Sequence, residues 1–389
     1  MSAEFAFSPI AVLGSTGSVG EQALDVARAS GIPVRALCAN RSVKRAEEQI
    51  REFRPAVCAM ADETAAAALR TAVADTPTRI YAGEEGICRM IAESDAQTVI
   101  NAIIGEAGLR STLTTLENKK KLALANKESL VVAGEIVMAM ARENGQDVLP
   151  VDSEHCAIYQ CLQAGRRRDV KRLILTASGG PFFGRRAEEM GEITVEQTLA
   201  HPTWNMGAKI TVDSATLMNK GFEVIEAVHL FGVCPSQVEV VVHRESIIHS
   251  MVEYVDNSVI AQLSVPDMRL CVQYALTGPA RTPSPLDTLD LTALGKLTFY
   301  KPDMETFVLL PTAIRAIEQG GALPAVLNAA NEVAVAHFLK HEITFRQIFD
   351  TVAQVTQDLS RAAQTHDLEG ILTWDREARE ETERLLSRT

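Results

Sequence analysis

The first part of the chain repeats one pattern, which limits what it can fold into. From Ile10 to about Pro150, short apolar runs alternate with amphipathic stretches. This alternation is typical of βαβ units, in which strands form a parallel sheet and helices cover it. The strands are predicted at 10–13, 34–38, 56–60, 98–103 and 121–125, with helices between them. The pattern therefore predicts an α/β domain over residues 1–150.

The pattern changes twice after this domain. With 389 residues, the chain is longer than one hydrophobic core usually organises. Residues 151–277 carry β-rich runs and predict an α+β domain, with strands at 238–242, 247–254 and 259–263. Residues 278–311 are rich in proline and predict a linker or crossing segment. Residues 312–389 follow the helical period and predict a small bundle, with helices at 313–319, 323–339, 345–359 and 375–386.

Composition excludes several classes of protein. Hydrophobic residues make up 47 % of the chain and charged residues 23 %, as in ordinary folded proteins. The formal net charge of −12 disfavours nucleic acid as a partner. The seven cysteines are scattered without a Cys-x-x-Cys pair, which indicates reduced thiols and a cytoplasmic location. No secretory signal pattern is present, and no window approaches the roughly 18 apolar residues of a membrane span.

A glycine-rich turn follows the first predicted strand and opens a helix. Gly14 allows a sharp turn, Gly17 lets a pyrophosphate approach the backbone, and Gly20 lets the helix pack on the sheet. In this position the turn predicts a dinucleotide site of a Rossmann-like domain, with helix N-terminal amides facing the anion. A purely structural turn between strand and helix is the alternative.

The residues after the second strand favour NADPH over NADH. NAD enzymes usually place an acid there for the ribose 2′-hydroxyl. This chain has Asn40, Arg41 and Ser42 instead. A guanidinium with neighbouring donors suits a 2′-phosphate.

Acidic residues indicate a cation site. A predicted strand ending near Val151 runs into Asp152, Ser153 and Glu154. Residues i and i+2 of a strand share a face, so the two carboxylates are expected to converge on Mg²⁺ or Mn²⁺. A capped turn is the alternative, because Asp and Ser are common helix N-caps.

Polar residues recur between 214 and 223, in a segment that reads as the start of a helix. Asn219 and Lys220 suit a phosphate, and Glu223 is a candidate third carboxylate for the cation. The glycine-rich turn at 176–183 is a second possible anion cradle. Residues 183–207 are irregular and carry Trp204, which is either the tip of a mobile lid or a buried anchor.

Taken together, these motifs make the chain resemble the 1-deoxy-D-xylulose 5-phosphate reductoisomerase family. Any one of the matching stretches would be suggestive at best, whereas all of them occur in one order across nearly the whole chain. They are 14–20, 125–129, 151–155, 176–182, 201–207, 212–223, 246–252, 266–269 and 328–332. One departure is visible, because many relatives carry Gly-Lys-Asn where this chain has Asn40-Arg41-Ser42.

The resemblance implies roles for individual residues. The implied metal ligands are Asp152, Glu154 and Glu223. The implied substrate contacts are Lys127, Ser153, Glu154, Ser178, His201, Ser214, Asn219, Lys220 and Glu223, with Trp204 and Met206 in a lid above them. The implied NADPH contacts are Thr16, Gly17, Ser18, Val19, Asn126, Glu128 and Gly207, beside Asn40, Arg41 and Ser42 at the 2′-phosphate.

The resemblance also implies an activity. It is an oxidoreductase that isomerises and reduces 1-deoxy-D-xylulose 5-phosphate to 2-C-methyl-D-erythritol 4-phosphate, in non-mevalonate isoprenoid precursor biosynthesis. The implied cofactors are NADPH and a divalent cation (Mg²⁺, Mn²⁺ or Co²⁺), and the implied assembly is a homodimer. Lys127 and Glu154 are the candidate proton-transfer residues.

Two other interpretations share the nucleotide loop. A semialdehyde or dihydrodipicolinate type reductase needs a nucleophilic cysteine or a basic substrate pocket rather than three carboxylates. A redox-sensing protein that holds NADPH without turnover is the second. Loss of activity in EDTA would separate the metal-dependent reductoisomerase from the first kind of reductase. Oxidation of NADPH with deoxyxylulose phosphate would separate an enzyme from the binding protein.

Overall fold

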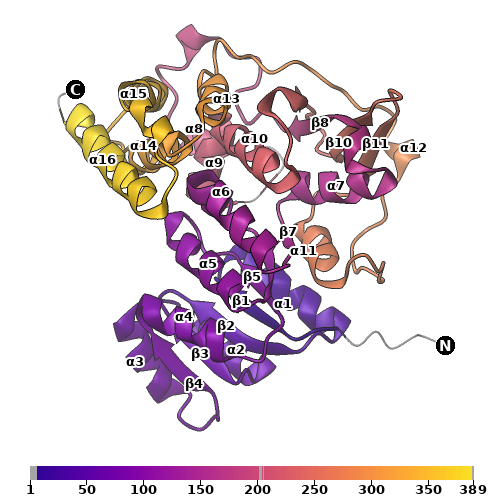
Figure 1. Ribbon diagram of the computed structural model, residues 1–389, viewed down its shortest axis with the longest axis vertical. Coiled ribbons are helices and arrows are strands. Elements are labelled where there is room, and N and C mark those ends of the chain that lie inside the picture. The colour runs from indigo at the N-terminus through magenta and orange to yellow at the C-terminus, as the bar shows by residue number, and fades with distance from the viewer. Residues whose placement is uncertain (1–6, 201–203, 205, 388–389) are drawn as a thin grey trace. The chain divides into compact units, whose positions relative to one another are not determined.

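The computed structural model describes residues 7–200, 204 and 206–387 (Figure 1). The chain forms two compact units, and each contains segments that are far apart in the sequence. The first unit comprises Met1–Ser129, Val137–Cys156 and Asp267–Asp287, and the second comprises Leu130–Ile136, Ala157–Pro266 and Thr288–Thr389. The four consecutive ranges predicted as domains remain a prediction, because compact packing alone does not assign function to them.

A seven-stranded parallel sheet forms the centre of the first unit, in the order β4-β3-β2-β1-β5-β6-β7. The strands are β1 (Ile10–Leu13), β2 (Val34–Ala39), β3 (Val57–Met60), β4 (Arg79–Ala82), β5 (Thr98–Asn101), β6 (Lys121–Leu124) and β7 (Val148–Pro150). The predicted Rossmann-like sheet is confirmed. The structure adds β4, which the sequence did not indicate, and β5 ends two residues before its predicted end.

Successive side chains of each strand enter different cores, because a strand alternates its side chains between the faces of the sheet. Ile10 and Val12 pack in one hydrophobic cluster with α1 (Ser18–Ser30), α2 (Val43–Phe53), α3 (Glu63–Ala72) and α11 (Met268–Thr277). Ala11 and Leu13 pack in another cluster with α4 (Gly83–Glu93). Two cysteines divide in the same way, since Cys58 belongs to the first cluster and Cys38 to the second.

The remaining helices of the first unit extend this arrangement. Helix α5 (Leu109–Glu117) contacts α4 and β6, and α11 contacts α1. Helix α6 (Glu128–Glu143) contains a break at Ala133, where φ is −139° and ψ is 36°. Residues 130–136 around this break belong to the second unit, whereas the rest of α6 belongs to the first.

A four-stranded mixed sheet, in the order β11-β10-β8-β9, lies in the second unit. Its strands are β8 (Val170–Ala177), β9 (Val238–Val242), β10 (Ile248–Tyr254) and β11 (Val259–Leu263). Strand β10 is antiparallel to both neighbours, and β8 is parallel to β9. The turn between β10 and β11 has Asn257 at a φ of 65° and Asp256 accepting a hydrogen bond from Ser258.

Helices complete the second unit. They include the last residues of α7 (Ser153–Cys161), whose first four residues belong to the first unit. The others are α8 (Val195–Leu199), α9 (Ala208–Ala215), α10 (Met218–Phe231), α12 (Leu291–Leu294), α13 (Leu309–Gln319), α14 (Leu323–Leu339), α15 (Phe345–Asp358) and α16 (Leu368–Leu386). Helix α14 packs against α15 and α16, which confirms the predicted helical bundle. The last helix begins seven residues before its predicted start, because Asp367 caps it by accepting the Gly370 N–H. Within the described ranges, no helix has both the length and the apolar character required to span a membrane.

Candidate functional site

The glycine-rich turn lies where the strand order of the first sheet reverses. Strand β1 lies between β2 and β5, and the chain reaches β5 only after building β2, β3 and β4 on the other side. In open α/β sheets, ligands bind at such a switch point, beyond the carboxyl ends of the strands. Gly17 is the N-cap of α1, so Thr16, Gly17, Ser18 and Val19 surround the free amides of this helix.

Close backbone contacts make two of these glycines obligatory. Gly14 has a φ of +76°, and a Cβ there would lie 2.5 Å from the Ala102 carbonyl oxygen. A Cβ on Gly20 would lie 2.2 Å from the Gly14 carbonyl oxygen. Gly17 is less crowded, with its nearest atom at 3.3 Å. The turn is thus built around residues that no side chain can replace without moving the backbone.

Gln49 of α2 holds the glycine-rich turn through hydrogen bonds to Ser15. The sequence analysis did not identify this role. The amide nitrogen of Gln49 donates to the Ser15 carbonyl oxygen at 2.9 Å, and the amide oxygen accepts the Ser15 hydroxyl at 2.8 Å. Both side chains are buried. A polar residue in an amphipathic helix normally faces water, so only the three-dimensional packing identifies Gln49 as a support of the nucleotide loop.

The three residues predicted at the 2′-phosphate follow β2, next to the glycine turn. Asn40 and Arg41 lie in the loop, and Ser42 is the N-cap of α2. The Arg41 side chain is 78 % exposed, and its Nε donates to Oδ2 of Asp62 at 3.0 Å. Asp62 is a second residue that the sequence analysis did not identify.

Asn126 organises the loop at the carboxyl end of β6. Its side-chain nitrogen donates to the carbonyl oxygens of Ile103 and Gly105, both at 2.8 Å. Its side-chain oxygen accepts the Ser129 N–H at 2.9 Å. Asn126 therefore holds the loop after β5 against the start of α6, where the buried Lys127 and Glu128 lie.

Asp152 and Glu154 follow β7, but not as residues of a strand. Strand β7 ends at Pro150 and α7 begins at Ser153, so the argument from strand parity was wrong. The Asp152 carboxylate accepts the Glu154 N–H at 3.2 Å, which makes it a cap of the helix. Both acids lie at the start of this helix, where Ser153 donates to Glu154 at 2.6 Å.

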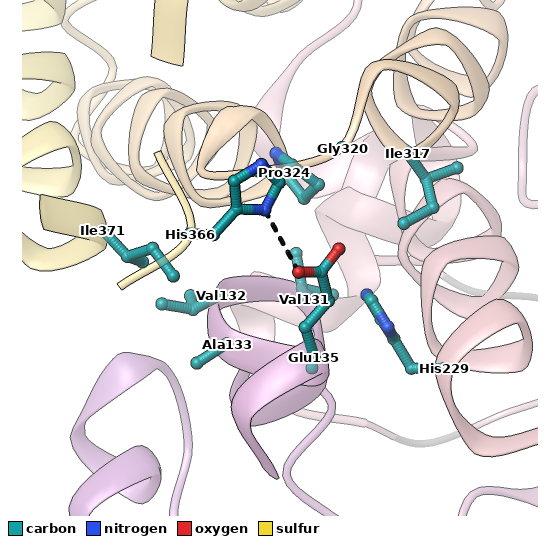
Figure 2. A pocket seen from close by; sticks show the side chains of 12 residues that line it. Val131, Val132, Ala133, Glu135, His229, Ile317, Gly320, Pro324, His366 and Ile371 are labelled. Atoms are coloured by element: carbon teal, nitrogen blue, oxygen red, sulfur yellow. Dashed lines mark hydrogen bonds and ion pairs between the residues drawn. The ribbon is translucent and has the colours of Figure 1, made fainter. Parts of the chain in front are cut away.

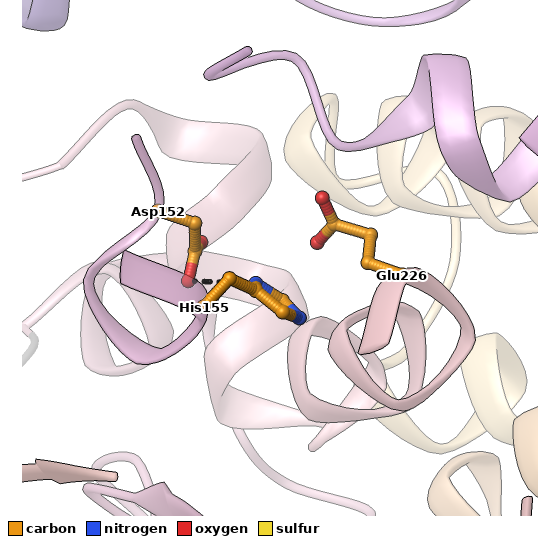
Figure 3. A group of neighbouring side chains, drawn as sticks. All are labelled: Asp152, His155 and Glu226. Atoms are coloured by element: carbon orange, nitrogen blue, oxygen red, sulfur yellow. Dashed lines mark ion pairs between the residues drawn. The ribbon is translucent and has the colours of Figure 1, made fainter. Parts of the chain in front are cut away.

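Basic groups surround Asp152. The ammonium of Lys127 lies 3.1 Å from one carboxylate oxygen. Nδ1 of His155 lies 3.3 Å from the other, the ion pair that Figure 3 marks. All of these side chains are buried or half-buried. The oxygen donors of Asp152 and Glu154 suit a hard divalent cation, so the residues present fit Mg²⁺ or Mn²⁺. Figure 3 also draws Glu226, which lies on α10 of the second unit.

In the second unit, the turn after β8 packs on the end of α9. Gly180 has a φ of +66°, and a Cβ there would lie 2.8 Å from the Ser214 carbonyl oxygen. Gly180 also donates its N–H to the Ser178 hydroxyl at 3.3 Å. Two predicted substrate contacts, Ser178 and Ser214, therefore come from neighbouring backbone segments although they are distant in sequence.

Three further predicted residues lie at the start of α10. Asn219 donates to one oxygen of Glu223 at 2.6 Å, and Lys220 forms an ion pair with the other. Lys220 and Glu223 are buried, with side-chain exposures of 4 % and 1 %. The prediction of one helix across residues 214–223 was wrong. Leu217, with a φ of 59°, interrupts the helix, so Ser214 lies in α9 and not in α10.

The predicted lid region is described only in part. His201 lies outside the described residues. Trp204 is half-buried, and its ring centroid is 6.4 Å from that of His249 in β10. Met206 precedes Gly207, which is the N-cap of α9. The assignment of Trp204 to a lid stays a prediction.

A separate pocket of the second unit surrounds the break in α6 (Figure 2). No predicted site residue lines it; the lining residues are Val131, Val132, Ala133, Gly134, Glu135, His229, Ile317, Gly320, Gly321, Pro324, His366 and Ile371. Nδ1 of His366 lies 3.2 Å from the Glu135 carboxylate. His229 packs against Gly134, where a Cβ would lie 2.3 Å from its ring.

Burial of His229 predicts a loss of stability in acid. Burial lowers the pKa of His229 from 6.5 to about 4, while Glu135 opposes this shift. Below pH 6.5 the His229 imidazole is protonated in the unfolded chain but stays neutral in the folded chain. The free energy of unfolding therefore falls as the pH decreases towards 4. The expected loss is at most about 3 kcal/mol. Urea unfolding at pH 7 and pH 4.5 should show a smaller loss for His229→Asn, whereas His366→Asn should behave like the parent chain. If the free energy of unfolding of His229→Asn depended on pH as in the parent chain, His229 would not be the group responsible.

Comparisons with known proteins identify the family of the chain. Three family models match: "1-deoxy-D-xylulose 5-phosphate reductoisomerase" over residues 10–134, its "C-terminal domain" over 148–231, and "DXP reductoisomerase C-terminal domain" over 263–381. A 1-deoxy-D-xylulose 5-phosphate reductoisomerase of Clostridium botulinum (strain Loch Maree) is 46 % identical over 375 residues, covering 95 % of this chain and 97 % of the relative. The one from Ruminiclostridium cellulolyticum is 48 % identical over 348 residues, covering 90 % and 91 %.

Solved structures match over almost the whole chain. The Zymomonas mobilis enzyme in complex with NADPH has a TM-score of 0.91 and 41 % identity, covering 97 % of this chain and 99 % of that one. A DOX-P reductoisomerase in complex with NADPH, fosmidomycin and magnesium has a TM-score of 0.92 and 39 % identity, covering 98 % of each chain. Both the sequence and the fold of this chain thus match these reductoisomerases over nearly its whole length. The chain belongs to the 1-deoxy-D-xylulose 5-phosphate reductoisomerase family.

Proposed function

We propose that this chain is an NADPH- and metal-dependent oxidoreductase that converts 1-deoxy-D-xylulose 5-phosphate to 2-C-methyl-D-erythritol 4-phosphate. The observation that carries this proposal is the common edge of the first sheet. Strands β1, β2, β6 and β7 are members of one parallel sheet, so the glycine turn, Arg41, Lys127 and Asp152 all follow its carboxyl ends. A nucleotide loop and a cation-binding pair of acids at one edge suit a reduction that also needs a Lewis acid.

The cofactor half of the site is assigned to the glycine turn and its neighbouring loops. We assign the pyrophosphate to the amides of Thr16, Gly17, Ser18 and Val19, and the 2′-phosphate to Asn40, Arg41 and Ser42. Asn126, Glu128 and Gly207 are the further proposed contacts. The crowded glycines and the Gln49 support give this loop the fixed backbone that phosphate binding requires.

Three carboxylates are the proposed metal ligands. They are Asp152 and Glu154, at the start of α7, and Glu223 of α10. A related DOX-P reductoisomerase has been solved in complex with magnesium, which supports a divalent cation, and Mg²⁺, Mn²⁺ and Co²⁺ remain the candidates. Such a cation, when bound, polarises a ketone and lowers the pKa of a neighbouring hydroxyl.

The chain's own residues would then hold the substrate and move its protons. Ser178, Ser214, Asn219 and Lys220 are assigned to the substrate phosphate, because hydroxyl, amide and ammonium donors suit a dianion. Lys127 and Glu154 are the proposed proton-transfer groups, and Ser153 is a neighbouring contact. His201, Trp204 and Met206 are assigned to a lid that excludes water.

The direct test is NADPH oxidation by the purified chain with 1-deoxy-D-xylulose 5-phosphate and Mg²⁺. We expect turnover that stops in EDTA and returns when Mg²⁺ or Mn²⁺ is added in excess. Turnover that EDTA does not affect would exclude the metal role. NADPH binding without turnover would instead support a binding protein. The cytoplasm is the proposed compartment, because a reducing environment matches seven free cysteines.

We also propose a homodimer, paired through the second unit. Strand β11 is an edge of its sheet, and Val259, Ile260 and Leu263 are 47 %, 37 % and 36 % exposed. An exposed apolar edge strand is a template for pairing with another chain. Light scattering should give twice the chain mass of 42.2 kDa, and Ile260→Lys should shift the population towards monomer. A parent chain that is monomeric at micromolar concentration would contradict this proposal.

A further inference from the structure

The loop that carries Arg41 is tied to two neighbouring loops at the carboxyl edge of the first sheet. The Ser15 N–H donates to the Cys38 carbonyl oxygen at 2.8 Å, which joins the glycine turn to the end of β2. The Asp62 N–H donates to the Asn40 carbonyl oxygen at 3.3 Å, which joins the loop after β3 to the same place. Asp62 therefore lies beside the residues proposed to bind the 2′-phosphate.

The Asp62 carboxylate is held in place independently of Arg41. Its Oδ1 accepts the Ala65 N–H at 2.9 Å, so it is the N-cap of α3. That hydrogen bond, with a smaller contribution from Arg41, keeps the pKa of the Asp62 carboxyl below its usual range. A fixed negative charge consequently remains next to Arg41 at neutral pH.

The contact leaves part of the Arg41 guanidinium available. A guanidinium has five N–H donors in a planar fork, and the hydrogen bond to Asp62 uses the one on Nε. The other nearby arginine differs, because Arg45 donates from Nε, Nη1 and Nη2 to Glu21 and Glu48. Arg41 is thus the better placed of the two arginines to receive an anion.

We infer that Asp62 is a specificity-determining residue, whose carboxylate competes with the adenosine 2′-phosphate of NADPH for Arg41 and so limits the preference for NADPH over NADH. The inference rests on the proposed NADPH site. A phosphate on the same guanidinium would lie near the fixed Asp62 charge, and like charges at short range repel. NADH carries a hydroxyl instead of this phosphate, so Asp62 leaves NADH binding almost unaffected.

The test is the Asp62→Asn variant, because asparagine is an equally good N-cap and has the same shape. Dissociation constants for NADPH and NADH are measured by fluorescence titration at low ionic strength. We expect NADPH to bind about three- to tenfold more tightly to Asp62→Asn than to the parent chain. NADH should change by less than about twofold, and the gain for NADPH should shrink in high salt because exposed charges are screened.

Two further variants isolate the mechanism. Asp75→Asn is the matched control, because Asp75 forms a similar exposed pair with Arg51 at 2.8 Å but lies before β4, at the amino edge of the sheet. This control should leave both constants unchanged. In an Arg41→Ala background, Asp62→Asn should lose most of its effect, since the competition needs the guanidinium.

Several outcomes overturn the inference. Unchanged or weaker NADPH binding in Asp62→Asn would show that Asp62 does not compete, and an equal gain in Asp75→Asn would show a general charge effect. These results leave the proposed function intact, provided that the parent chain binds NADPH. A parent chain that binds neither nucleotide would refute the proposed function, and the inference with it.

Discussion

Asp152→Asn should reduce turnover by orders of magnitude while NADPH binding stays nearly unchanged. Asparagine removes the charge that a divalent cation needs and the anionic partner of the Lys127 ammonium, but it keeps the N-cap of α7. NADPH is proposed to bind at the glycine turn, whereas the cation is proposed to act on the substrate. Activity assays at increasing Mg²⁺, together with NADPH titration, separate the two effects. A variant with parent activity and parent metal dependence would remove Asp152 from the site.

The same loss of turnover is expected for Glu154→Gln and Glu223→Gln, but Glu223 carries an additional structural cost. Lys220 is buried against Glu223, so a glutamine there leaves an ammonium without its carboxylate. Glu223→Gln should therefore also lower the melting temperature. Combining Glu223→Gln with Lys220→Met should recover part of that stability without recovering activity. Recovery of activity in the double variant would contradict a metal role for Glu223.

The second large effect is expected from Gly20→Ala, which should abolish NADPH binding and destabilise the fold. The new Cβ would lie 2.2 Å from the Gly14 carbonyl oxygen and 2.7 Å from the Ser15 Cα, both of which are backbone atoms. Helix α1 must then move away from the turn, at an expected cost of roughly 1–3 kcal/mol. Gly17→Ala is the matched control for fold stability, because its Cβ would lie 3.3 Å from the nearest atom. Thermal unfolding measures both variants, and equal melting temperatures for the two would show that the turn tolerates the displacement.

The parallel sheet could be predicted because its central strands are continuous apolar runs. Strand β1 is buried at all four positions, as expected for a strand covered on both faces. Strand β4 escaped prediction because it is an edge strand, in which only Ile80 is buried. The end of β7 was misjudged for another reason. A strand and the first turn of a helix are both compatible with the Asp-Ser-Glu sequence, and the cap formed by Asp152 decides between them.

The candidate site could be predicted only in part, since the sequence indicates chemical groups and not their neighbours. The glycines, the acids and the phosphate-binding set were identified from residue type and resemblance. Gln49 and Asp62 were not, because each acts through a partner supplied by another loop. Convergence of Glu223 with Asp152 and Glu154 remains a proposal, for they lie in different segments and different units.

Cys38 and Cys58 lie in cores on different faces of the sheet, so alkylation of the folded protein can report on the opening of each face. Cys38 and Cys58 are fully enclosed by different hydrophobic clusters, and burial raises the pKa of Cys38 to about 12. Alkylation requires the thiolate, so each sulfur reacts only when its own side of the sheet opens. Pulsed alkylation followed by peptide mass analysis would therefore time the exposure of the two faces separately. Exposed Cys234 provides the internal reference for complete reaction.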